Sequence, residues 1–544
     1  MLTRRELLKY GVTAATLSGF SPRLARGDDG DGARTPFKLQ PFLDPLPVPL
    51  VKSTFSTGPN CVGALPVIGT QASPGTHQYI ERPDCAPVCA YTLDVKEGSH
   101  LFHSQMPGLT KIFGYDGTFP GPTFHAQYGQ PILVREFNNL PKDHVGFGIP
   151  SISTHLHNGH TASESDGYPG NFHDNGTYWD NHYANILNGF SRDPEVTSSN
   201  DCMNTLWYHD HRQDFTAQNV YAGLAGFYLL FDPQDCGDET NRNGFQLPSG
   251  AFDVPMVFAD KVFDANGQAV FDFFNLDGIL GDMYTVNGTV QPYLEVQQRK
   301  YRFRLLDAGP SRFYAFALSD GTPLIQIAND GNLLAAPVIR SVVTIGVAER
   351  HDVIIDFSKY QVGDKVYLMN RAEQTDGRGP TGDLLTPGVP LVEFRVRLLQ
   401  APDVSQIPST LRPLPPADLS QVVKTRSWEF NRGDGQWTVN GKVFNDNEIR
   451  ASVKCNTSEV WTLKNGGGGW SHPIHIHFEE YRTLSRNGGT PPVFENRKDV
   501  AVLGPGEEVQ VLFNFRDFLG RYVMHCHNVV HEDHAMMIRF DIVP

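Results

Sequence analysis

The sequence predicts an all-β protein built from three units of comparable size, and three observations support this. Glycine and proline are frequent, at 52 and 39 of 544 residues, which favours short strands joined by turns over long helices. Strand-like runs recur, as at 131–137 and 224–232, and residues 300–306 alternate charged and apolar side chains as a half-buried strand does. The third observation is a sign of internal duplication, since MYTVNG at 283–288 resembles QWTVNG at 436–441.

The three units follow one another along the chain, and each is expected to be a sandwich of strands. The first is predicted at 45–235 and closes with the apolar run at 224–232, and the second is predicted at 250–400. Residues 401–419 are rich in proline and serine and are expected to form a linker. The third unit takes residues 420–544.

The N-terminus has the features of an export signal. Arg4 and Arg5 precede a short apolar stretch at 10–20, which is too brief to span a bilayer. The pattern resembles a twin-arginine signal, which is used for proteins that fold and load their cofactors before export. Residues 1–26 are therefore predicted to be such a signal, and the protein is expected to be periplasmic or secreted. The alternative is a disordered tail that contains two arginines.

The charge balance limits the classes of partner. The formal net charge is -15, and because the first 26 residues carry a net charge of +4, the remaining chain carries -19. So acidic a surface disfavours nucleic acids and anionic membranes. The sequence has no uninterrupted apolar run of eighteen or more residues, so we expect no membrane span. The expected partners are small molecules, and the expected state is a monomer.

The seven cysteines are expected to serve two purposes. Cys526 lies inside a His-Cys-His triplet and is best explained as a metal ligand. The others are predicted to form disulfides in an oxidising compartment, with a pairing that the sequence leaves open. These six are Cys61, Cys85, Cys89, Cys202, Cys236 and Cys455.

Half of the 20 histidines fall into four short motifs, and each motif contains a His-x-His pair. On a strand, residues two apart point to the same face, about 6.5 Å apart along the chain. A single pair is more often two surface histidines or half of a zinc site. Four pairs together would bring eight imidazoles to one place, and burying them without a metal would be costly. The eight are His155, His157, His209, His211, His475, His477, His525 and His527.

The triplet at 525–527 predicts a second metal centre beside the first. If both of its histidines face the cluster, alternation along the strand turns Cys526 to the opposite face. There it can join His472 and His531. A thiolate, two imidazoles and a weak axial thioether form the ligand set of a blue copper site, and Met536 supplies the thioether.

All four motifs, in this order and near the two ends of the chain, resemble those of the multicopper oxidases. The likeness is greatest to the three-domain bacterial laccases of the spore-coat type and to bilirubin oxidases, and it covers almost everything from about residue 45 to the end. The resemblance implies three cupredoxin-like Greek-key β-barrel domains with a three-copper cluster between the first and the third. It also implies an enzyme that oxidises a donor by single electrons and reduces dioxygen to water.

The resemblance further implies four copper ions and their ligands. The type 1 copper would be bound by His472, Cys526 and His531, with Met536 as its axial ligand. The remaining ligands are carried over position by position: His155 and His475 for the type 2 copper, His157, His209 and His527 for one type 3 copper, and His211, His477 and His525 for the other.

Two acids resemble positions where laccases keep carboxylates near the oxygen site. They are Asp166, in the run SDGYP at 165–169, and Glu532, which directly follows His531. Reduction of dioxygen to water consumes protons, so we expect both acids to deliver them. The alternative is that each only orients a ligand histidine.

The donor is the least determined part of the prediction. Trp470 lies two residues before His472, a spacing that resembles bilirubin oxidases, where a tryptophan lies beside the type 1 copper. The alternative is a tryptophan packed in the core. Oxidation of phenols, aromatic amines or tetrapyrrole pigments would need an open cleft over His472. Oxidation of Cu(I), Fe(II) or Mn(II) is the second hypothesis, disfavoured because the chain has only 9 methionines and no Met-rich insert. The third, a copper-binding or electron-transfer protein without turnover, would not need eight clustered histidines.

Overall fold

The computed structural model describes residues 34–144, 146–187, 199–414 and 416–544. The proposed export signal at 1–26 lies outside these residues. Within the described part of the chain, no helix is both long and apolar enough to cross a membrane. The described residues form two short α-helices, α2 (Thr216–Ala222) and α3 (Val529–Asp533), and five 3-10 turns at Val62–Ala64, Ser199–Asp201, Gly250–Phe252, Phe357–Lys359 and Val493–Glu495. The predicted all-β class is confirmed.

The first unit has two main sheets and one strand pair, β7 (Ser151–Ile152) with β9 (His173–Asp174). One sheet contains, in spatial order, β1 (Ser56–Thr57), β3 (Cys89–His100), β6 (Ile132–Asn138), β10 (Thr177–Tyr183) and β2 (Thr70–Gln71), with β4 (Thr110–Tyr115) paired to β3. The other contains β5 (Gly121–Gln127), β12 (Ala225–Phe231), β11 (Thr205–Asp210) and β8 (Thr154–His157).

The second unit has the same two-sheet plan. Its larger sheet contains β15 (Thr289–Val290), β14 (Met283–Val286), β13 (Asp253–Lys261), β17 (Lys300–Asp307), β22 (Arg350–Asp356), β19 (Leu324–Asn329) and β20 (Asn332–Arg340). Its smaller sheet contains β16 (Tyr293–Gln297), β24 (Leu384–Arg397), β23 (Lys365–Ala372), β18 (Tyr314–Leu318) and β21 (Val343–Ile345).

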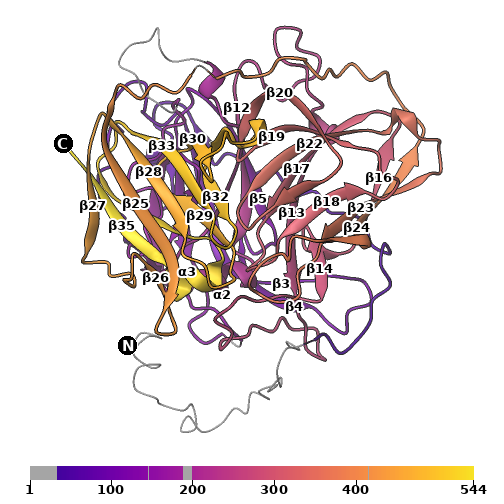
Figure 1. Ribbon diagram of the computed structural model, residues 1–544, viewed down its shortest axis with the longest axis horizontal. Helices are drawn as coiled ribbons and strands as arrows, with labels where there is room; N and C mark the ends of the chain where they lie inside the picture. The colour runs from indigo at the N-terminus through magenta and orange to yellow at the C-terminus, as the bar shows by residue number, and fades with distance from the viewer. Residues whose placement is uncertain (1–33, 145, 188–198, 415) are drawn as a thin grey trace.

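The third unit repeats the plan once more. One sheet contains β26 (Gln436–Val439), β25 (Val422–Gly433), β28 (Thr457–Asn465), β33 (Glu508–Phe515), β30 (Tyr481–Arg486) and β31 (Arg497–Lys498). The other contains β27 (Ile449–Lys454), β35 (Met537–Val543), β34 (Gly520–Cys526), β29 (His472–Ile476) and β32 (Val500–Leu503). In Figure 1 the third unit and the second unit lie on opposite sides of the molecule, with α2 and α3 in contact between them.

Each unit has its own hydrophobic core, as alternation of apolar residues along the strands requires. Tyr208 lies in the core of the first unit, Phe303 in that of the second, and Trp461 in that of the third. The similar segments at 283–288 and 436–441 also have equivalent structures. Each is a strand followed by an Asn-Gly turn in which both residues have positive φ, 49° and 78° at Asn287 and Gly288, and 48° and 70° at Asn440 and Gly441.

The predicted disulfides are not found, since no two of the seven cysteines are bonded to each other in the structure. Several of them pack as small apolar side chains instead. Cys85 is fully buried in the core cluster of the third unit, and burial raises the pKa of its thiol to about 11. Burial likewise raises the pKa of Cys202 to about 12, and the Cys61 thiol contacts the carbonyl oxygen of Pro87 at 3.3 Å.

The separate core of the second unit leads to a stability prediction. Phe303 is 1% exposed and its ring lies 5.1 Å from that of Phe394, so Phe303→Ala leaves a cavity and should lower the unfolding free energy by about 3–5 kcal/mol. Circular dichroism in urea measures this, because the chain has no tryptophan between 250 and 400 to report on this unit. Ile339→Ala, at a side chain that is 63% exposed in the same unit, is the control and should change little. Equal losses from both variants would contradict the separate core.

Candidate metal centres

Four strands from two units bring the eight predicted histidines together. β8 and β11 pair so that His209 lies opposite His155, and β29 and β34 pair so that His475 lies opposite His525. The alternation of each strand sends both members of a His-x-His pair to the same face. All eight imidazoles are at most 1% exposed. The first and third units therefore enclose one cluster, called here the eight-histidine cluster.

The inner nitrogens of the cluster converge as metal ligands do. The Nε2 atom of His211 lies 3.1 Å from Nε2 of His477 and 3.1 Å from Nε2 of His525, and these last two are 3.3 Å apart. A second pair of Nε2 atoms, on His155 and His475, is 3.3 Å apart. Neutral imidazoles cannot donate hydrogen bonds to one another at all of these contacts, whereas a cation satisfies every lone pair.

The remaining members of the cluster carry buried nitrogens without a hydrogen-bond partner among the described residues. They are Nδ1 of His157, Nε2 of His209 and both ring nitrogens of His527. Burial is the main cause that lowers the pKa of seven of the eight imidazoles, and for His209 it lowers the pKa to about 3. A cluster of neutral, unpartnered imidazoles fits copper.

The outer nitrogens are held by oxygen atoms, which fixes the orientation of each ring. In six of the histidines the held atom is Nδ1, so that Nε2 points inward. Its partners are the Asp166 carbonyl for His155, the Asp210 carbonyl for His209 at 2.8 Å, Glu532 for His211 at 3.2 Å, the Asp499 carbonyl for His475 at 2.9 Å, Asp166 for His477 at 2.7 Å, and Glu532 for His525 at 3.1 Å. His157 is reversed, because its Nε2 lies 3.1 Å from the Asp499 carboxylate.

Both acids proposed from the sequence lie against the cluster. The Asp166 carboxylate contacts His477 and lies 3.4 Å from the Thr161 hydroxyl, and burial raises the pKa of Asp166 well above its ordinary value. Burial alone would also raise the pKa of Glu532, but the adjacent His211 and His525 lower it to about 2. The two carboxylates are fully enclosed and differ in the state that their surroundings favour.

The second centre is formed by Cys526 on the other face of β34. The Cys526 Sγ atom is 3.5 Å from Nδ1 of His472 and 3.6 Å from Nδ1 of His531, and those two nitrogens are 3.2 Å apart. Met536 is fully buried, and its backbone accepts a hydrogen bond from the Cys526 amide and donates one to the His531 carbonyl. A sulfur and two imidazole nitrogens in a triangle, beside a buried methionine, fit a mononuclear copper site.

Two tryptophans cover this second centre. The Trp437 ring packs against His531 with the two ring centres 3.8 Å apart and the planes tilted by 32°, and the rings of His472 and Trp470 lie 5.6 and 5.2 Å from it. His472 is completely buried, so the open cleft expected over it is wrong. The sequence analysis did not identify Trp437, and its only signal was the repeated TVNG turn that follows it.

The surface above the tryptophans comes from two units. The guanidinium carbons of Arg378 and Arg432 lie 4.8 and 5.1 Å from the centre of the Trp470 ring. Asp277 links the two arginines, with its Oδ1 atom 2.5 Å from Arg432 and its Oδ2 atom 3.6 Å from Arg378. The carbonyl of Asp277 also lies 3.0 Å from Nε2 of His531. This group of four residues, Trp470, Arg378, Arg432 and Asp277, is called here the tryptophan platform.

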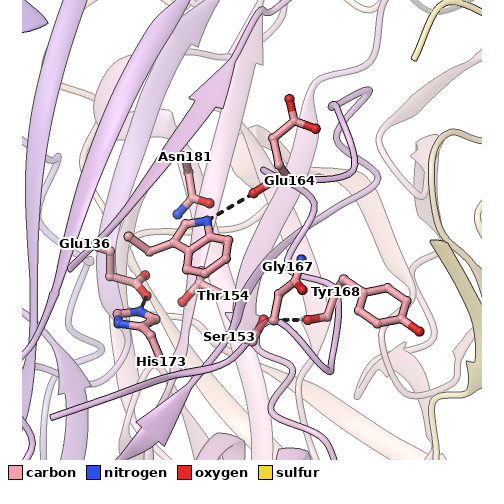
Figure 2. A pocket seen from close by; sticks show the side chains of 10 residues that line it. Glu136, Ser153, Thr154, Glu164, Gly167, Tyr168, His173 and Asn181 are labelled. Carbon is pink, nitrogen blue, oxygen red and sulfur yellow. Dashed lines mark hydrogen bonds and ion pairs between the residues drawn. The ribbon is translucent and has the colours of Figure 1, made fainter. Parts of the chain in front are cut away.

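A small polar cavity lies behind the strand that carries His155 (Figure 2). Glu136 faces His173 there, with its Oε1 atom 3.3 Å from Nε2 of the imidazole, and the Ser153 hydroxyl donates to the Tyr168 carbonyl at 3.0 Å. The cavity is also lined by Thr154 and Gly167, the sequence neighbours of His155 and Asp166. Space for water therefore exists one residue away from the eight-histidine cluster.

Comparisons with known proteins agree with this geometry. Two family models described as multicopper oxidase match residues 103–235 and 413–544. A bilirubin oxidase from Albifimbria verrucaria is 34% identical over 516 residues, which cover 92% of this chain and 81% of that protein. A laccase from Bacillus subtilis is 31% identical over 511 residues, covering 83% of this chain and 94% of that protein. A solved laccase structure from Pediococcus acidilactici has a TM-score of 0.73 and 25% identity, and covers 94% of this chain and 97% of its own.

The backbone contact that places Asp277 beside the second centre can be tested. A Cβ atom on Gly377 would lie 2.2 Å from the carbonyl oxygen of Gly278, so Gly377→Ala must displace the loop that carries Asp277. We expect a stability loss of about 1–3 kcal/mol and a shifted blue absorption band in the copper-loaded protein. Gly75→Ala is the control, because its Cβ would meet no described atom within 4 Å. An unshifted band in Gly377→Ala would show that the loop does not position this centre.

Proposed function

Because the chain belongs to the multicopper oxidase family, we propose that it oxidises small aromatic molecules at the Cys526 centre and reduces dioxygen to water at the eight-histidine cluster. The observation that carries this proposal is the placement of both candidate centres on the two faces of one strand, β34. The family implies copper cofactors and oxygen as the electron acceptor. The donor, the number of copper ions and the location of the protein are parts of the proposal.

Four copper ions account for the full set of candidate ligands. His472, Cys526, His531 and Met536 would hold a type 1 copper. The type 2 copper would be held by His155 and His475, one type 3 copper by His157, His209 and His527, and the other by His211, His477 and His525. Copper bound at these centres supplies one-electron redox chemistry, and the protein supplies the arrangement of ligands.

The covalent chain joins the two centres. Cys526 faces one centre, and its neighbours in sequence, His525 and His527, face the other. An electron that enters at the Cys526 sulfur therefore needs to cross only one or two peptide units of β34. All three residues are buried, which keeps water away from the path.

The tryptophan platform supports an aromatic donor. Trp470 is half-buried and offers a ring on which a flat π-system can stack, while the guanidinium groups of Arg378 and Arg432 can donate to oxygen atoms on such a molecule. The Trp470 ring also adjoins Trp437, which packs against His531. A donor at the platform is thus separated from the Cys526 centre by one layer of aromatic side chains. Phenols, aromatic amines and tetrapyrroles share the required shape, and relatives named laccase and bilirubin oxidase agree with this class.

Oxidation of Cu(I), Fe(II) or Mn(II) is the second candidate function, and two observations weigh against it. Asp277, the acid of the tryptophan platform, is engaged by two arginines and is poorly placed to bind a metal substrate. Of the 9 methionines, the three at Met524, Met536 and Met537 are at most 2% exposed, so they offer no thioether surface to Cu(I).

Asp166 and Glu532 are proposed to deliver the protons that oxygen reduction consumes. Each carboxylate contacts imidazoles of the cluster, and Asp166 does so through His477 while Glu532 does so through His211 and His525. A proton released at either carboxylate has only a ligand ring between it and the centre of the cluster. The alternative role, orientation of the ligand rings alone, predicts the same contacts and has to be separated by experiment.

The setting of the enzyme is also proposed. The twin-arginine pattern at 3–9 supports export to the periplasm or the medium after folding, which suits an enzyme that must acquire copper. A monomer that meets small molecules and dioxygen, with neither nucleic acid nor membrane as a partner, is consistent with the acidic net charge.

Oxygen uptake by the copper-loaded protein tests the donor class. We expect fast uptake with bilirubin and with a methoxyphenol and slow uptake with Cu(I), each offered separately. Trp470→Ala should lower kcat/KM for the organic donors about tenfold, because a stacking contact is lost, and should leave Cu(I) oxidation unchanged. Uptake with Cu(I) alone would make the protein a metallo-oxidase and remove the role assigned to Trp470.

Replacement of Asp166 tests proton delivery. Asp166→Asn keeps the shape of the side chain but removes its proton, so reoxidation of the reduced enzyme by dioxygen should slow by about 10²-fold or more. The blue band and the rate of reduction by donor should stay intact, since the Cys526 centre lies on the other face of β34. Stopped-flow absorption measures both rates. Unchanged oxygen kinetics would leave Asp166 with an orienting role only.

A further inference from the structure

We propose that Arg350, in the unit that contributes no histidine to the eight-histidine cluster, positions two of the cluster's ligands through Asp499. This inference rests on the proposed copper assignment and goes beyond it, because it gives the second unit a part in oxygen reduction. Arg350 is a positioning residue, since it acts on the ligands through Asp499 and does not touch the cluster itself. Neither Arg350 nor Asp499 belongs to a motif that the sequence analysis recognised.

Asp499 holds two histidines with two different groups. Its carboxylate Oδ1 atom lies 3.1 Å from Nε2 of His157, and its backbone carbonyl lies 2.9 Å from Nδ1 of His475. Under the proposed assignment these histidines serve a type 3 and the type 2 copper. Asp499 is completely buried, so both contacts are shielded from water. One residue therefore sets the orientation of ligands on two different ions.

The contact with His157 also selects its tautomer. A carboxylate accepts a hydrogen bond, so Nε2 of His157 carries the proton and Nδ1 presents its lone pair. Nδ1 has no hydrogen-bond partner among the described residues, as expected for the metal-binding atom. The other six cluster histidines with a held nitrogen are held through Nδ1, so His157 needs a different partner from theirs. Asp499 is that partner.

Arg350 fixes the Asp499 carboxylate from the second unit. Its Nη1 and Nη2 atoms lie 2.8 and 2.5 Å from the two carboxylate oxygens, which is the bidentate geometry of an arginine–carboxylate pair. The Nε atom donates to the Thr205 carbonyl at 3.2 Å, on the strand that carries His209. Arg350 is also completely buried. Without the guanidinium, Asp499 would be a buried carboxylate lacking its main counter-charge and the two hydrogen bonds that hold it in line with His157.

A second layer of contacts links the Arg350–Asp499 pair to residues of all three units. Asp330 accepts from the Arg350 amide at 3.1 Å and from the Asp499 amide at 3.3 Å, and its carbonyl accepts from the Asn158 side chain at 2.9 Å. Lys498 lies 2.9 Å from Asp330 and 2.6 Å from a carboxylate oxygen of Glu349. Asn158 directly follows His157 in the sequence. The residues around Arg350 thus hold the backbone beside His157 as well as its ring.

The test compares Arg350→Met with a matched control. Arg412→Met removes another completely buried arginine, paired with Asp232 and with the Cys202 carbonyl, that does not contact the cluster. Copper content and the electron paramagnetic resonance spectrum of the type 2 ion are measured first, and then single-turnover reduction by donor and reoxidation by dioxygen. Both variants are expected to lose stability, and only Arg350→Met should alter the type 2 spectrum.

The expected result for Arg350→Met is an intact blue band, an unchanged rate of reduction by donor, a copper content below that of the wild type, and reoxidation slowed about tenfold or more. Arg350→Lys should recover only part of the copper content and reoxidation rate, since lysine restores the positive charge but not the bidentate geometry of the guanidinium. If Arg350→Met does not fold, Asp499→Asn, which keeps the side-chain volume, should show the same spectral change.

Two results would overturn the proposal. One is a folded Arg350→Met variant with wild-type copper content, type 2 spectrum and reoxidation rate. The other is an equal spectral change in Arg412→Met, which would assign the effect to general destabilisation. Failure of the proposed function itself would look different, because the wild-type protein would then bind no copper at the eight-histidine cluster or show no oxygen uptake.

Discussion

Alternation of side chains along β34 is the constraint on which both centres depend. His525 and Cys526 end the buried strand β34 and His527 follows directly, so the thiol points to one face and the two imidazoles that flank it point to the other. One face meets the strands of the first unit and completes the eight-histidine cluster. The other meets His472, His531 and the covering tryptophans. A bulge at Cys526 would disconnect the two centres, because it would turn the thiol toward the cluster or its neighbours away from it.

Oxygen atoms behind the ligands turn this cluster of imidazoles into a defined site. Backbone carbonyls and three acids, Asp166, Asp499 and Glu532, hold one nitrogen of seven rings and leave the other nitrogen pointing inward. The carboxylates also bring negative charge to a place where several cations are to be bound. The buried arginine and lysine around Asp499 balance part of that charge, and they come from two different units. The site is therefore complete only when the three units are packed together.

Aromatic side chains and a loop of the second unit cover the Cys526 centre. No candidate ligand of the Cys526 centre is exposed, and the aromatic layer formed by Trp437 and Trp470 covers this centre. The glycine contact between residues 278 and 377 brings a loop of the second unit close enough for Asp277 to reach both His531 and the two arginines. The second unit thus shapes the donor surface as well as supporting the cluster, although it provides no candidate copper ligand.

The sequence by itself determined the all-β class, the membership of the family and the set of candidate copper ligands. These were accessible because period-two spacing, Asn-Gly turns and His-x-His pairs are local patterns, and a strand converts sequence spacing directly into a shared face. Only the tertiary structure decided what surrounds those residues. The absence of disulfides among the seven cysteines and the burial of His472 belong here, and so do the Trp437 contact and the Arg350–Asp499 pair, which join segments far apart in the chain. Such contacts depend on how whole units pack. A single arginine or tryptophan forms no sequence pattern from which its contact partner could be predicted.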